Sequence, residues 1–176
     1  AYSSTAQCET ASLYFDEAIN ISVQLHNYKK AIVIYSLKVI RCILDLGGNL
    51  QEALQIALRV KEKTAKSEDP EFKFLANRLL INVYWDQPEF REEFLNLAIE
   101  NHELSLETGN KELQTQASFH LAYAYTDVEK FDLAIENYHE VIKHQLSQGN
   151  HAVSASYNNL GSIYARISEH DSALHY

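Results

Sequence analysis

Residues 157–164 read YNNLGSIY, and this stretch decides the fold. Its large side chains, Tyr157, Leu160 and Tyr164, recur at positions i, i+3 and i+7, with Gly161 between them. Such spacing places an apolar stripe on one face of an α-helix, and the glycine lets a second helix approach closely. A further small residue, Ala173, follows where the second helix would meet the first. The stretch therefore predicts a hairpin of two antiparallel helices.

The same pattern stands one repeat earlier in the chain. Residues 118–125 read SFHLAYAY, and Ala134 follows them. The offset from 118 to 157 equals that from 134 to 173, about 39 residues, and two anchors at one offset are hard to produce by chance. A period of this size is typical of stacked helical hairpins, each of which buries its apolar face only against its neighbours.

Glycine and proline mark the ends of the predicted helices. Gly109 and Gly149 stand where helices should end in a left-handed cap, as does the Gly-Gly pair at 47–48. Asp69 is a predicted N-cap, and Pro70 fits the first helical position because its missing N–H costs nothing there. We predict helices over 5–26, 29–46, 50–66, 71–86, 89–108, 111–127, 131–148 and 151–167, and a last one from about residue 170.

The pattern formed by Tyr157, Leu160, Gly161, Tyr164 and Ala173 resembles the W-x2-L-G-x2-Y…A signature of the tetratricopeptide repeat family, with Tyr in the place of Trp. The resemblance covers about residues 29–176. It implies an all-α fold, a right-handed superhelical solenoid of antiparallel helix pairs that spans 1–176. The expected parts are an N-terminal helix (1–28), three repeats (29–69, 70–110 and 111–150) and an incomplete fourth repeat (151–176).

The family resemblance also implies a function and a site. Tetratricopeptide arrays bind peptides, helices or loops of partner proteins in a concave groove that the first helix of each repeat lines. Carried over residue by residue, the family pattern predicts a groove formed by Phe74, Asn77, Arg78, Tyr84, Gln116, Phe119, His120, Tyr123, Asn158, Asn159 and Ser162. From the sequence we expect that exchanging Asn158 and Asn159 for alanine weakens partner binding and leaves melting unchanged.

The long period and the Gly-Asn connections resemble those of bacterial signalling members of the family. In such proteins the array is often fused to an output domain, such as a diguanylate cyclase (GGDEF type) or a histidine kinase. We therefore expect the sensory or regulatory region of a larger signalling protein, since the chain stops at Tyr176 inside a predicted second helix. The alternatives are a stand-alone adaptor for complex assembly and a peptide-pheromone receptor. A homodimer through an exposed solenoid end is a further alternative.

Composition excludes several classes of function. A net charge of −9 disfavours binding to nucleic acid or to anionic membranes, although it leaves a local basic pocket open. The sequence has no apolar run long enough for a membrane span. Its eight histidines are scattered, and it has neither a glycine-rich phosphate loop nor a nucleophile motif. We therefore expect no catalysis, cofactor or metal in this segment. Two free cysteines fit a cytoplasmic location, with the periplasm as an alternative.

Overall fold

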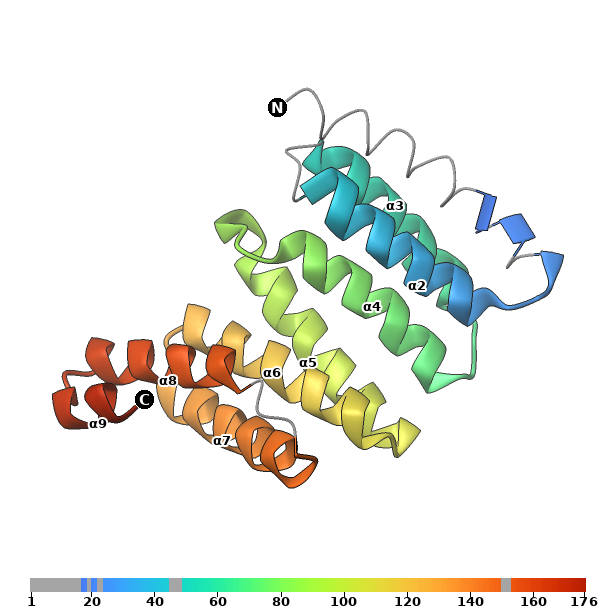
Figure 1. Cartoon of the computed structure of the whole chain (residues 1–176). Helices are drawn as coiled ribbons and strands as arrows, with labels where there is room; N and C mark the ends of the chain where they lie inside the picture. The colour runs from blue at the N-terminus through green and yellow to red at the C-terminus, as the bar shows by residue number, and fades with distance from the viewer. Residues whose placement is uncertain (1–16, 19, 22–23, 45–48, 150–152) are drawn as a thin grey trace. The chain divides into compact units, whose positions relative to one another are not determined.

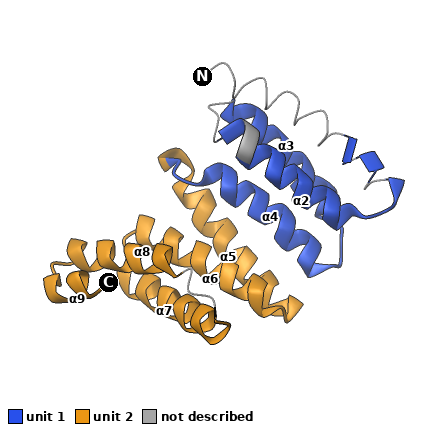
Figure 2. Cartoon of the chain, viewed as in Figure 1, with its two compact units in different colours: residues 1–87 blue, residues 88–176 orange. Residues whose placement is uncertain are grey.

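The computed structural model describes residues 17–18, 20–21, 24–44, 49–149 and 153–176. These residues form helices joined by short turns, with no β-strand among them, so the all-α prediction is confirmed (Figure 1). The chain divides into two compact units, residues 1–87 and residues 88–176 (Figure 2). The division falls inside the expected repeat 70–110, between its two helices. Whether both units belong to one solenoid stays a prediction.

From Tyr28 onwards, the described residues of unit 1 form three α-helices and a π-helical turn. Helix α2 (Tyr28–Lys38) runs into the π-helix Val39–Leu44, and α3 (Leu50–Thr64) and α4 (Pro70–Tyr84) follow. Helix α3 packs on α4, and α2 also contacts α4. The predicted helices lie within a few residues of these bounds, but the π-helix was not predicted. The expected helix 5–26 and the glycine pair at 47–48 lie mostly outside the described residues. Within that expected helix, residues 17–18 and 20–21 are described and helical.

Unit 2 begins with a 3-10 turn, Pro88–Phe90, and continues with α5 (Arg91–Thr108) and α6 (Lys111–Asp127). Three more helices follow, α7 (Phe131–Ser147), α8 (Ser154–Arg166) and α9 (His170–His175). Each helix packs on the next, and α6 also contacts α8. Consecutive helices therefore form the hairpins that the repeat pattern predicts.

Short polar connections set the helix ends. Gly109 ends α5 in the left-handed region (φ 67°), and the side chain of Asn110 then accepts a hydrogen bond from the Glu112 amide at 3.0 Å. The Gly-Asn pair thus ends one helix and begins the next within two residues, a double role that the sequence analysis missed for the asparagine. Gly149 has the same φ of 67°. The predicted cap at Asp69 is confirmed, because its Oδ1 accepts from the Glu71 amide at 3.0 Å.

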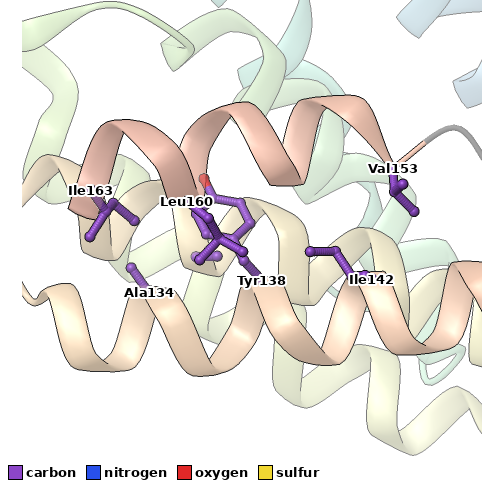
Figure 3. Close-up of a cluster of buried hydrophobic side chains, with 7 residues drawn as sticks. Ala134, Tyr138, Ile142, Val153, Leu160 and Ile163 are labelled. Carbon is purple, nitrogen blue, oxygen red and sulfur yellow. The ribbon is translucent and has the colours of Figure 1, made fainter. Parts of the chain in front are cut away.

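One buried core cluster of unit 2 lies where α7 meets α8. Its residues are Ala122, Ala134, Tyr138, Ile142, Val153, Leu160 and Ile163. Figure 3 shows Ala134 and Tyr138 on α7 facing Leu160 and Ile163 on α8. The two alanines are fully buried, as expected for small residues at a helix contact. Gly161 also meets the following helix, but a Cβ there would lie 3.5 Å from the Ala173 carbonyl oxygen, so an alanine would fit.

We expect Ala134→Phe to lower the Tm by several degrees. The larger ring would force α7 away from its neighbours, and overpacking of this kind costs about 1–3 kcal/mol. Thermal unfolding followed by circular dichroism measures the effect. The control is Leu133→Phe at the adjacent exposed position, which should leave the Tm unchanged. An unchanged Tm for Ala134→Phe would show that the helices do not meet closely at this alanine.

A charged cluster joins the starts of α2 and α4 in unit 1. The Lys29 Nζ lies 2.8 Å from Asp69 Oδ2 and 3.0 Å from Glu71 Oε2. The hydrogen bond from Lys29 lowers the pKa of the Asp69 carboxyl group, and the backbone amides of Phe72 and Glu71 act in the same direction. Because all three side chains are about two-fifths exposed, solvent screens the ion pairs. The cap at Asp69 is then the main stabilising contribution of the cluster.

We expect Asp69→Ala to reduce the free energy of unfolding by about 1 kcal/mol at pH 7. The folded-state pKa of Asp69 is lowered, so its contribution is present above the unfolded-state pKa of about 3.9 and is lost as the pH falls through the folded-state value. Urea unfolding at pH 7 and at about pH 3 should show the difference from the parent shrinking in acid. Glu68→Ala is the matched control. A difference that is the same at both pH values would mean that the carboxylate is not the stabilising group.

Candidate partner-binding face

The four predicted groove residues of unit 1 all lie on α4, but they differ in burial. Phe74 and Asn77 are buried, with exposed fractions of 0% and 2%. This burial argues against a partner contact for these two residues, and their place in the groove stays a prediction. Arg78 and Tyr84 are half-buried, and burial lowers the pKa of the Arg78 guanidinium. Of the four predicted groove residues in unit 1, only Arg78 and Tyr84 keep accessible surface.

Three of the predicted residues of α6 use their side chains for contacts inside unit 2. Phe119 meets the ring of Tyr138 edge-on, with centroids 5.7 Å apart, and so contributes to the core. Tyr123 meets Phe94 in the same way at 5.8 Å. The side chain of Gln116 donates to Glu112 Oε1 at 3.1 Å. Together with His120 these residues are half-buried.

The predicted residues of α8 separate into two exposed positions and one structural position. Asn158 and Ser162, one helical turn apart, are exposed. Asn159 is half-buried, and its Nδ2 donates to the Tyr138 hydroxyl at 2.9 Å. Because Tyr138 is fully buried, its hydroxyl needs partners within the protein, and burial raises the pKa of this group. Asn159 thus ties α8 to α7, which argues against the expectation that exchanging both asparagines leaves melting unchanged.

We expect Asn159→Ala to destabilise the protein by about 1–2 kcal/mol, because the buried Tyr138 hydroxyl loses a hydrogen-bond donor. Asn158→Ala is the natural control, since its side chain is exposed and adjacent in sequence. Thermal unfolding of the two variants should give a lower melting temperature for Asn159→Ala than for Asn158→Ala. Equal melting temperatures would show that the bond between α8 and α7 does not contribute to stability.

Two cavities of unit 2 lie beside other residues of the same helices. One, of about 360 Å³, lies between α5, α6 and α7 and has Leu121, Tyr125 and Glu136 among its lining residues. The other, of about 270 Å³, lies between α6 and α7 around Thr115 and His144. Neither cavity includes a predicted groove residue. The predicted face is therefore a surface of α6 and α8 rather than part of either hollow.

The described residues carry neither a metal cluster nor a membrane helix. Within the described ranges, no group of three or more His, Cys, Asp or Glu side chains could hold a metal ion. In the same part of the chain, no helix is both long and apolar enough to cross a bilayer. The accessible groups on the predicted face are amides, a hydroxyl, an imidazole and an aromatic edge. These groups recognise peptide backbone and polar side chains by hydrogen bonding.

Comparison with protein-family models, curated proteins and solved structures finds no significant match to this chain. The tetratricopeptide resemblance consequently rests on the residue pattern of the last two repeats and stays a prediction. The helix order and the packing of each helix on the next agree with that prediction.

Proposed function

We propose that this chain is a protein- or peptide-binding module built as a tetratricopeptide-like solenoid. One packing observation carries the proposal: α6 contacts α8, its next helix but one, as well as α7. The same relation recurs in unit 1, where α2 contacts α4. In an array of two-helix repeats the first helices of successive repeats are neighbours, and together they line the binding face. This packing supports the repeat register that the sequence predicts.

The binding face that we propose in unit 2 consists of Gln116, His120 and Tyr123 on α6 with Asn158 and Ser162 on α8. Its character is polar, with one aromatic edge and no lysine or arginine. Such a face favours an extended peptide held through its backbone over a ligand held by a terminal carboxylate. The α6 and α8 surfaces lie in one unit, so the face does not depend on unit 1.

The proposed biological setting is the regulatory region of a larger signalling protein, as the long period and Gly-Asn connections indicate. In that setting, peptide binding would alter the output of an attached domain. A stand-alone adaptor is the second candidate, and the same face would then hold a subunit of a complex. The two candidates share the binding face and differ in what is attached to it.

A peptide-library selection against the whole chain tests the proposal. We expect peptides that bind the parent protein to lose at least about tenfold in affinity to Asn158→Arg and to Ser162→Arg, because a long charged side chain covers the face. Fluorescence anisotropy of labelled peptides measures the Kd. Gln148→Arg, an exposed position at the end of α7, is the control. Failure to select any peptide, or equal affinity for all three variants and the parent, would refute the proposed face.

A further inference from the structure

The 270 Å³ cavity lies at the end of the α6–α7 hairpin away from its turn. It is formed by the first half of α6 and the last half of α7, both in unit 2. The lining residues are Lys111, Gln114, Thr115, Ser118, Glu140, Val141, Lys143, His144 and Ser147. On α6 these follow an i, i+3, i+4, i+7 pattern, so they form one stripe on the side of the helix that faces α7.

Side-chain size explains why a hollow remains here. Towards the turn of the hairpin the ring of Tyr138 packs against Phe119 of α6, and it is the largest fully buried side chain among the described residues. At the cavity the facing stripes include three short side chains, Thr115, Ser118 and Ser147. Thr115 and Ser118 are more than nine-tenths buried, so their hydroxyl groups are part of the protein interior.

A histidine is held in a defined orientation at this cavity. The Thr115 Oγ1 lies 2.6 Å from His144 Nδ1 and donates to the Lys111 carbonyl oxygen at 2.9 Å. Because a hydroxyl group has one proton, this donation leaves the Thr115 oxygen to accept from the Nδ1–H of His144. The hydrogen bond fixes the ring through Nδ1 and leaves the lone pair of Nε2 to accept from a hydroxyl group of a ligand.

Cationic groups are concentrated at the same place, although unit 2 is acidic. Its lysines and arginines are Arg91, Lys111, Lys130, Lys143 and Arg166, and two of the five line this cavity. The Lys111 Nζ donates to Gln114 Oε1 at 2.9 Å, which keeps the ammonium group near the cavity without neutralising its charge. Arg166, by contrast, is paired with Glu129 at 2.8 Å.

We propose that this cavity binds the oxyanion of a small molecule, a phosphate or carboxylate group. Lys111 and Lys143 supply positive charge at its edge, and His144 Nε2 can accept from a hydroxyl group of the ligand, such as that of a protonated phosphate. The Ser118 hydroxyl group is a further donor in the lining, whereas the Ser147 hydroxyl group already donates to the His144 carbonyl oxygen at 2.7 Å. Glu140 is the only acid there and opposes the anion. The site lies on the α7 side of α6 and is independent of the proposed partner-binding face.

Titration of the whole chain with inorganic phosphate, and separately with acetate, tests this site by isothermal calorimetry and by the ring-proton NMR signals of His144. We expect saturable binding and a shift of those signals. The double variant Lys111→Gln/Lys143→Gln should weaken binding about tenfold or more, whereas Glu140→Gln should tighten it several-fold. The charge-matched controls outside the cavity are Lys130→Gln and Glu169→Gln, which should leave the Kd unchanged.

The two anions identify the ligand chemistry. Binding of phosphate without acetate would assign the site to phosphate groups, and similar binding of both would assign it to oxyanions in general. Absence of saturation with either anion would overturn the proposal. Equal effects of the cavity variants and their controls would also overturn it, because attraction would then come from net charge alone. Unchanged melting curves for all variants confirm that folding is not the cause.

Discussion

The contact of α7 with its neighbours at Ala134 is the constraint on which unit 2 depends. A single hairpin of two helices leaves one apolar face exposed to solvent, and a further helix must pack on that face to bury it. Ala122 and Ala134 let α6 and α7 approach closely, which brings Tyr138, Leu160 and Ile163 into one core. The order of the helices and the faces that stay in solvent both follow from this packing.

Residues that act within a few positions of one another made the helices and their ends predictable. Helix α6 was predicted at its observed bounds, 111–127, because the Gly-Asn pair before it and the i, i+3, i+4 pattern within it are local signals. The Asp69 cap with Pro70 was predictable for the same reason. The π-helix at 39–44 was not, since no residue pattern in that stretch distinguishes it from an α-helix.

The candidate site was less predictable, because a position in a repeat does not determine what lies opposite it. Phe74 and Asn77 fall at groove positions of the family pattern, yet other parts of the fold bury them. Asn159 falls at another such position, and its amide is used by Tyr138, twenty-one positions earlier in the chain. The 270 Å³ cavity between α6 and α7 was not predicted, because Thr115 and His144 come together only when the two helices pack. The only signal in the sequence is that Thr115 and Ser118 fall on one face of α6.

The division of the chain at residue 87 gives each half its own optical reporter. The single tryptophan, Trp85, caps the last helix of unit 1 and is half-buried. Unit 2 holds a ring stack in which Tyr164 and Tyr176 lie 5.5 Å apart and nearly parallel. Indole fluorescence therefore follows unfolding of the first half, and tyrosine near-ultraviolet dichroism is weighted towards the second. Coincidence or separation of these two signals on heating would show directly whether the chain unfolds as one cooperative body or two.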